Sequence, residues 1–204
     1  MERRRIGWIF LICMVVVLLG PHVHAGAPTE TIQARINQVL EVLRDPALKD
    51  EAREVKVEKI RAIINEIFDR TELSRRTLGR DWKKLSAEQQ NEFIDLFNRL
   101  LEKVYADRVL NYAGEKVVFE KESELGRDKV EVQTNIITSD NKEIPLYYRM
   151  ISKNGQWAVY DVIIEGVSLV KNYRTQFGDI LAKKPPEELL EILRKKVNEG
   201  DTSS

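Results

Sequence analysis

The feature that most constrains the fold is the run WAVYDVIIE at residues 157–165, which carries apolar side chains at both odd and even positions. Successive side chains of a β-strand point to opposite faces of its sheet, so both faces of this strand must be covered. Gly166 ends the run, and the apolar residues after it have the spacing of an amphipathic helix. The pattern therefore predicts a central strand followed directly by a packed helix.

Three runs further upstream, at residues 117–124, 130–138 and 144–151, are also predicted to be strands. In the second run, Glu131 and Gln133 alternate with apolar residues, so one face of that strand contacts solvent. Together with residues 157–165, these runs predict a sheet of four strands.

The dipeptide Asn154-Gly155 is typical of a two-residue turn in a β-hairpin. It therefore fixes the register between the last two strands. The expected cross-strand pairs are Met150 with Val159, Tyr148 with Asp161, and Leu146 with Ile163.

The remaining segments have the period of amphipathic helices. Ser86 and Gln89 match a capping box, which predicts the start of a long helix. We expect helices between Pro28 and Pro46 and at residues 51–68, 71–79, 86–110, 168–182 and 187–197.

The order of helices, an antiparallel meander and then helices predicts an α+β fold, with helices packed on a curved four-stranded sheet. No repeat or linker divides the chain, so residues 26–204 are expected to form one domain.

The first 25 residues are typical of a secretory signal peptide. Three arginines at 3–5 precede an apolar run at 6–20, and a small-residue cleavage site ends at Ala25. An uncleaved anchor helix is the alternative, but this run is shorter than the roughly 20 residues that a bilayer crossing needs. We therefore expect a mature chain that begins at residue 26.

Cleavage would remove Cys13 and both histidines, His22 and His24. A Ser-His-Asp triad, a cysteine nucleophile, a disulfide and a zinc site with His or Cys ligands are then excluded. Of the 33 basic and 33 acidic residues, 30 and 32 would remain, so the charge gives no basis for binding nucleic acid.

Enzymatic chemistry has one candidate residue. The sequence contains neither GxxxxGK[ST] nor GxGxxG, so nucleotide hydrolysis is not expected. Asp161 lies near tyrosines, and such a carboxylate can move protons in enzymes with a cone-shaped α+β fold. The alternative is a buried structural carboxylate, satisfied by Tyr148, backbone amides or an arginine. No second acid or base accompanies Asp161, which favours the structural role.

Large apolar side chains are concentrated on the 86–110 helix, the inner sheet face and the helix that follows Ser168. These side chains fit either a filled core or the lining of a cavity. Period and spacing alone do not distinguish the two.

The stretch WAVYDVIIEGVSLVKNYRTQF at 157–177 closely resembles the MlaC or toluene-tolerance family of periplasmic phospholipid carriers. Further matches are LSRRTLGRDW at 73–82, the segment 89–112, and YYRM at 147–150. The resemblance covers nearly all of the mature chain in the same order. Tyr147 departs from the pattern, since a polar residue is expected there, and this concerns the mouth of the pocket.

The resemblance implies a cone-like, NTF2-like fold around an apolar pocket, in a carrier that is not an enzyme and has no cofactor. Such a carrier holds a glycerophospholipid with its acyl chains between helices and sheet. The implied partners are an outer-membrane lipoprotein–porin complex and an inner-membrane ABC lipid transporter complex, and the implied role is to maintain outer-membrane lipid asymmetry. We expect a periplasmic monomer.

Carried over to this sequence, the resemblance assigns the inward-facing bulky residues to the lipid pocket. These are Trp82, Phe93, Phe97, Leu100, Leu101, Val104, Tyr105, Tyr112, Val132, Leu146, Tyr148, Met150, Trp157, Val159, Ile163, Val167, Leu169, Val170, Tyr173 and Phe177. Arg149 and Arg174 are candidate contacts for the headgroup, with a solvated surface position as the alternative for each.

Two functions of other classes remain open. One is an enzyme that acts on a small apolar substrate through Asp161 and a tyrosine. The other is a periplasmic adaptor with a filled core and no ligand.

Overall fold

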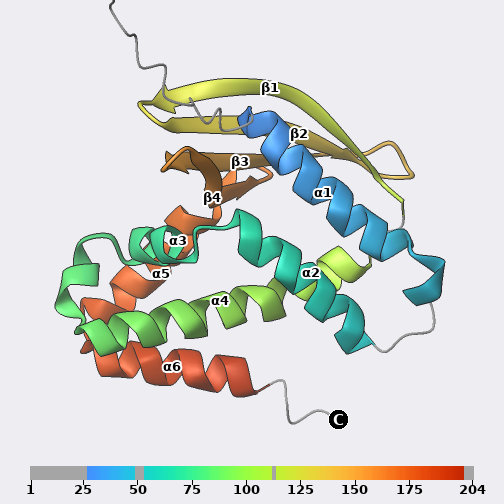
Figure 1. Cartoon of the computed structure of the whole chain (residues 1–204). Helices are drawn as coiled ribbons and strands as arrows, with labels where there is room; N and C mark the ends of the chain where they lie inside the picture. The colour runs from blue at the N-terminus through green and yellow to red at the C-terminus, as the bar shows by residue number, and fades with distance from the viewer. Residues whose placement is uncertain (1–26, 49–52, 112–113, 200–204) are drawn as a thin grey trace, which may run out of the picture.

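The computed structural model describes residues 27–48, 53–111 and 114–199. Within these residues, one sheet and six α-helices form the α+β fold that the sequence predicts. The sheet lies at one side of the molecule, and the helices α2 to α6 are stacked beneath it (Figure 1). The predicted signal peptide at 1–25 lies outside the described residues.

The sheet is an antiparallel meander in which each strand pairs with the next one along the chain. Its strands are β1 (Lys116–Gly126), β2 (Lys129–Ile137), β3 (Glu143–Lys153), β4 (Gln156–Ile164) and β5 (Val167–Ser168). The two-residue β5 is an addition to the four predicted strands. It forms because Glu165 and Gly166 both adopt positive φ, which turns the chain back against the end of β4.

The predicted hairpin joins β3 and β4. Asn154 and Gly155 have φ values of 51° and 77°, as a type I′ turn requires. Met150 lies opposite Val159, as expected from this turn. The register then shifts by one residue, because Tyr160 is an extra residue on β4 and forms a β-bulge.

The two cross-strand pairs predicted beyond this bulge are wrong, because the extra residue displaces the rest of β4 by one position. The observed pairs are Tyr148 with Val162 and Leu146 with Ile164. Val162 and Ile164 therefore face the helices, whereas Asp161 lies opposite Arg149 on the other face.

The helices begin and end close to the predicted positions. They are α1 (Pro28–Arg44), α2 (Arg53–Ile67), α3 (Arg70–Leu78), α4 (Ala87–Leu110), α5 (Leu169–Leu181) and α6 (Pro186–Asn198). The capping box of α4 is confirmed. The backbone N–H of Gln89 donates to the Ser86 hydroxyl, and the Gln89 side-chain oxygen accepts from the Ser86 N–H at 2.9 Å.

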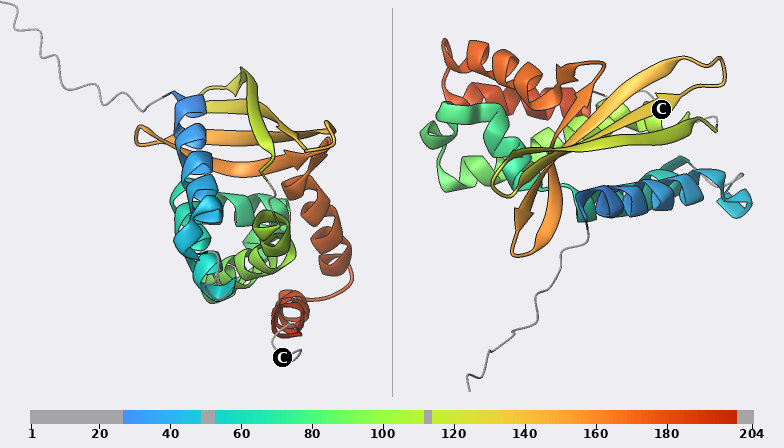
Figure 2. Two further views of the ribbon diagram at one scale, coloured as in Figure 1. Left: turned by 90° about the vertical axis from the view of Figure 1, so that its right-hand side faces the viewer. Right: turned by 90° about the horizontal axis from the view of Figure 1, so that it is seen from above.

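Two apolar clusters stabilise the fold. The helical core lies among α3, α4, α5 and α6, and its centre is a group of rings that includes Phe93, Phe97 and Phe177. The sheet core lies between the sheet and the ends of α1 and α2 that face it. Phe68, in the short link from α2 to α3, packs against both cores. Figure 2 shows α1 and α2 along one side of the molecule and α5 along the other.

No helix in the described ranges combines the length and the apolar composition that a membrane crossing requires.

Candidate functional site

An apolar cavity of about 250 Å³ lies between the two cores. Helices α2 and α4 form two of its walls, and β3, β4 and the first residue of α5 form a third. Its apolar lining comprises Val57, Ile60, Ile64, Phe68, Leu73, Leu101, Tyr105, Ala106, Val109, Leu110, Tyr148, Val162, Ile164 and Leu169.

The periodicity of each wall places these side chains. On α2, Val57, Ile60 and Ile64 are three and four residues apart, so they share one face of the helix. On α4, the lining residues 98, 101, 105 and 109 repeat in the same way. On the sheet, Tyr148 lies directly opposite Val162, so both reach the cavity from adjacent strands.

The strands β3 and β4 contribute only uncharged side chains to the cavity wall. Burial raises the pKa of the Tyr148 phenol well above its usual value. The neutral phenol is therefore the form present at all physiological pH values, and it contributes an uncharged aromatic surface.

The edge of the cavity is polar. Arg61, Asn65 and Arg70 contribute from the α2 and α3 side, while Asn98 and Glu102 contribute from α4. The Nε of Arg61 lies 2.8 Å from Glu102 Oε2, which joins α2 to α4 at this edge. A second hollow of about 760 Å³ adjoins the cavity there and is lined mainly by charged side chains.

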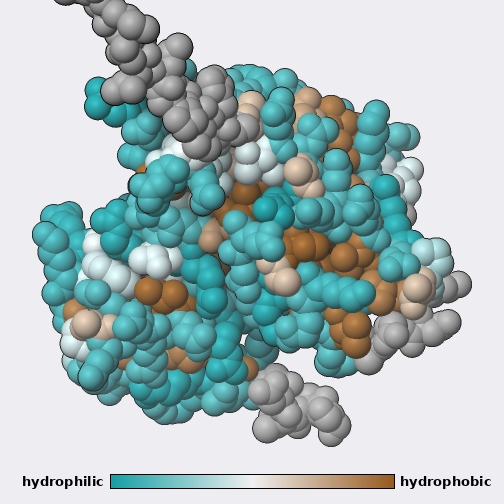
Figure 3. All heavy atoms as spheres, in the orientation of Figure 1, coloured by the Kyte–Doolittle hydropathy of each residue, from teal (hydrophilic) through white to brown (hydrophobic). Residues whose placement is uncertain are grey.

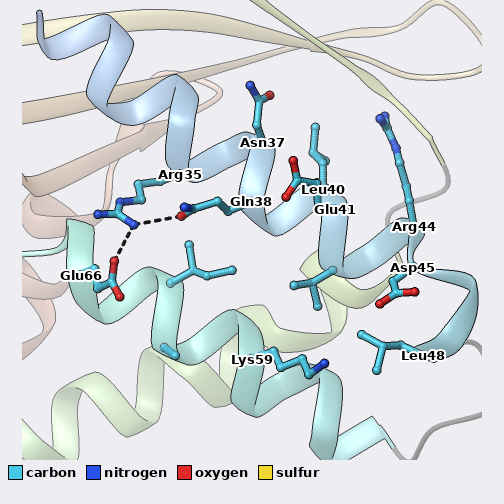
Figure 4. Close-up of a pocket in the computed structure, with 13 residues that line it drawn as sticks. Arg35, Asn37, Gln38, Leu40, Glu41, Arg44, Asp45, Leu48, Lys59 and Glu66 are labelled. Carbon is cyan, nitrogen blue, oxygen red and sulfur yellow. Dashed lines mark hydrogen bonds and ion pairs between the residues drawn. The ribbon is translucent and has the colours of Figure 1, made fainter. Parts of the chain in front are cut away.

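A third hollow, of about 880 Å³, is a different feature. It is an open groove between α1 and α2, rimmed by charged side chains such as Arg35, Glu41 and Lys59 (Figure 4). Arg35 bridges the groove to Glu66 and also donates to Gln38. Apolar atoms lie on this side of the molecule between α1 and α2, surrounded by hydrophilic surface (Figure 3). The groove is open to water, so it offers less shelter to an apolar ligand than the cavity between α2 and α4.

Four of the residues that the sequence assigns to the pocket line this cavity: Leu101, Tyr105, Tyr148 and Leu169. Most of the others are packed in the cores. Trp82, Phe93, Phe97, Leu100, Val170, Tyr173 and Phe177 belong to the helical core or its edge, and Val132, Leu146, Met150, Trp157 and Val159 to the sheet core or its edge.

The remaining assigned residues are elsewhere. Val104 and Val167 are 45% and 58% exposed. Ile163 is buried, but it pairs with Tyr147 and Ser168 on strand positions that alternate with the cavity-lining ones. Tyr112 lies outside the described residues.

Neither candidate headgroup arginine lines the cavity. Arg149 lies on the opposite face of the sheet, where its Nε donates to Glu131 at 3.0 Å and its Nη1 to Asp161 at 3.4 Å. Arg174 of α5 donates from Nε and Nη2 to the carbonyl of Arg76, at 2.8 and 2.6 Å, which ties α5 to α3. Both side chains therefore have structural partners.

Asp161 has the structural role that the sequence favours, but with different partners. Its carboxylate accepts hydrogen bonds from the Ser168 hydroxyl at 2.7 Å and from the Val170 N–H at 3.0 Å, in addition to Arg149. These contacts hold the first turn of α5 against β4. Tyr148 is not a partner, because the bulge places it opposite Val162.

The contribution of α2 to the cavity was not predicted from the sequence. Val57, Ile60 and Ile64 form the wall that faces α4, and Arg61 stands beside them at the edge. The signal in the sequence is the apolar stripe of this helix, but such a stripe has the same spacing whether it faces a core or a cavity.

Comparison with known proteins identifies the family. A model of the MlaC protein family matches residues 33–195. The intermembrane phospholipid transport system binding protein MlaC of Haemophilus influenzae is 34% identical over 119 residues, which is 56% of either chain. The toluene tolerance protein ttg2D of Pseudomonas putida is 24% identical over 101 residues, which is 50% of this chain and 47% of ttg2D. The chain thus spans about half the length of these curated relatives.

A solved structure has the same fold. The phospholipid-binding protein of Ralstonia solanacearum, in complex with a phospholipid, superposes with a TM-score of 0.76. It is 24% identical, and the match covers 83% of this chain and 96% of that one. The family match extends over most of the chain, from α1 to α6, and the fold agrees with it. The chain therefore belongs to the MlaC family.

Proposed function

We propose that this protein is a periplasmic carrier that binds a glycerophospholipid with its acyl chains in the cavity between α2, α4 and the sheet. The observation that carries the proposal is the apolar lining of this cavity, in a chain of the MlaC family. The phospholipid named for the Ralstonia solanacearum protein, and the transport system named for the Haemophilus influenzae relative, support the choice of ligand.

The energetics of lipid transfer explain why a carrier needs only such a cavity. Burying one methylene stabilises by about 0.8 kcal/mol, and two acyl chains contain about thirty methylenes. The summed transfer free energy exceeds the practical limit of about 20 kcal/mol for a non-covalent complex, so unaided departure from a membrane is very slow. A carrier replaces the membrane interior with another apolar environment, which requires no catalytic group.

The cavity must enlarge to hold the tails. Pockets for drug-sized ligands measure roughly 300–1,000 Å³, and the cavity here measures about 250 Å³. Because helix α2 is held at its C-terminal end, we propose that it pivots there. There Asp69 N–H donates to the Val159 carbonyl at 2.9 Å, and Phe68 packs on both cores. Outward rotation of α2 about this point would widen the space beside α4.

Within the proposal, the protein exchanges lipid with an inner-membrane ABC transporter complex and with an outer-membrane lipoprotein–porin complex. It works as a monomer and binds no nucleic acid. Any directional bias then comes from the transporter ATPase, and the carrier itself needs no nucleotide site.

The test is to purify the protein from the periplasm without detergent, extract it with organic solvent and analyse the extract by mass spectrometry. We expect about one phospholipid per protein. Delipidated protein should also take up phospholipid from vesicles. The proposal is refuted if the extract contains no lipid and vesicles supply none. That result would instead support the adaptor with a filled core.

A matched pair of variants locates the binding site. Leu101→Asp places a carboxylate in the cavity wall, where an unpaired charge is costly beside acyl chains. Val104→Asp places the same carboxylate on the exposed side of the same helix. We expect lipid to be lost from the first variant and retained in the second, with circular dichroism to verify that both fold.

A further inference from the structure

Two arginines at the edge of the cavity, Arg61 and Arg70, each have a buried Nε donor without a hydrogen bond within the described residues. Arg61 Nη1 donates to Glu58 of the same helix, and Arg61 Nε is close to Glu102, at 2.8 Å, but without the geometry of a hydrogen bond. For Arg70, the carboxylate in reach is that of Asp95, 3.9 Å from Nη2. Buried polar groups are normally hydrogen-bonded, so these two donors call for an explanation.

The position of the two arginines points to a ligand. Both line the apolar cavity, and both also line the adjoining charged hollow of about 760 Å³. They therefore stand where the apolar lining ends and a polar space begins. A ligand whose apolar part fills the cavity must place its polar part next to them.

The charge around this boundary favours an anion. The charged hollow is lined by five cationic and three acidic side chains. They are Arg53, Arg61, Arg70, Arg99 and Lys103, and Asp95, Glu102 and Asp107. Glu58 lies outside this lining but pairs with Arg61, so the surplus is one positive charge, which would attract one additional negative charge.

We propose that Arg61 and Arg70 form a phosphodiester site, which takes the phosphate of the lipid whose tails occupy the cavity. This inference rests on the proposed function. A guanidinium matches phosphate oxygens with two parallel N–H donors, and such charge-assisted bonds are stronger than neutral ones. The phosphate supplies the acceptors that the two Nε donors lack, and it competes with Glu58 and Glu102 for Arg61. As all glycerophospholipids carry this phosphate, the site recognises the class without selecting the head alcohol.

Uptake from vesicles tests the site. Delipidated protein is offered phosphatidylglycerol and, in parallel, diacylglycerol with the same acyl chains but no phosphate. Charge-assisted hydrogen bonds stabilise enough for a preference of about tenfold or more for the phospholipid. In the double variant Arg61→Gln/Arg70→Gln, this preference should fall to about twofold, with diacylglycerol uptake by the same variant as the reference. The control is Arg80→Gln, which removes one positive charge at an exposed position outside the cavity lining. This variant should keep the full preference for phosphatidylglycerol over diacylglycerol.

The outcomes separate the two proposals. If wild-type protein takes up neither lipid, the carrier function itself fails. If both lipids are taken up and the double variant keeps the tenfold preference, the carrier stands and the phosphodiester site is overturned. Diacylglycerol uptake by the double variant also shows that it is folded.

Titration of delipidated protein with inorganic phosphate tests the alternative source of the anion. If inorganic phosphate binds as tightly as the lipid, and this binding is lost in the double variant, the site is one for free phosphate. That result would overturn the proposal that the phosphate belongs to the lipid whose tails occupy the cavity. We expect binding at least a hundredfold weaker, since free phosphate lacks the apolar contribution of the tails.

Discussion

Filling the cavity should stabilise the protein and abolish lipid binding. Ala106 of α4 is a suitable position, because its side chain lines both the apolar cavity and the hollow beside it. An apolar cavity of about 150 Å³ is large enough to hold benzene in another protein. The cavity here measures about 250 Å³, so the ring introduced by Ala106→Phe fits without displacing its walls.

The magnitude follows from the burial of the ring. Full burial of a Phe side chain stabilises by about 1.5–3 kcal/mol, from which the lower helix propensity of Phe subtracts about 0.5 kcal/mol. The net gain is about 1–2.5 kcal/mol in the free energy of unfolding. For a domain of this size, each kcal/mol raises Tm by about 2–4 °C, so delipidated Ala106→Phe should melt several degrees above delipidated wild type.

The assay combines thermal unfolding of delipidated protein with mass spectrometry of the lipid bound after exposure to vesicles. Val104→Phe is the control, because it places the same ring on the exposed side of α4. We expect Ala106→Phe to have a higher Tm and little bound lipid, and Val104→Phe to bind lipid normally. Full lipid occupancy in Ala106→Phe would show that the tails bind elsewhere, and a lower Tm would show that the cavity is not available to the ring.

Two further predictions concern the fold around the site. Asp161→Ala should lower the free energy of unfolding by about 2–4 kcal/mol in a denaturant titration, because Val170 N–H and Ser168 lose a charged acceptor. Its folded fraction should bind lipid normally, and a normal stability would contradict the structural role. Burial by itself would raise the pKa of Glu72, but hydrogen bonds and charges from Arg75 and Arg76 outweigh it and hold that pKa below the usual 4.5. A carboxylate whose pKa is lowered in the folded state stabilises the fold fully only above its pKa in the unfolded state. At pH 7 the free energy of unfolding of wild type should therefore exceed that of Glu72→Gln by roughly 1–2 kcal/mol, and this difference should shrink as the pH falls below 4.5. A difference that stays constant with pH in urea titrations would contradict this.

The sequence was sufficient for the elements and for much of their pairing. The capping box at Ser86 and Gln89 and the turn at Asn154-Gly155 act over a few residues, so their geometry follows from local chemistry. The bulge at Tyr160 was not predictable in this way. The order of apolar and polar residues in β4 gives no sign of a bulge. The extra residue becomes visible only when β4 is paired with β3.

The cavity was harder to predict than the fold. All four of Phe93, Val170, Leu101 and Leu169 are apolar and contact the helical core, yet only Leu101 and Leu169 also line the cavity. Which of them contacts empty space depends on the distance between α2 and α4, which no periodicity specifies. Arg61 and Arg70 were missed for a related reason. On an otherwise polar helix surface, only the fold shows which arginines border an apolar space.

The placement of the cavity between the two cores has a consequence for the proposed uptake and release of lipid. Each core is closed by its own contacts, with the phenylalanine rings in one and Met150 and Val159 in the other, and Phe68 touches both. In the proposed carrier, lipid would enter and leave at this boundary as α2 pivots near Phe68, and the packing within each core would be retained. The proposed carrier would therefore alternate between the loaded and the empty state many times at little structural cost.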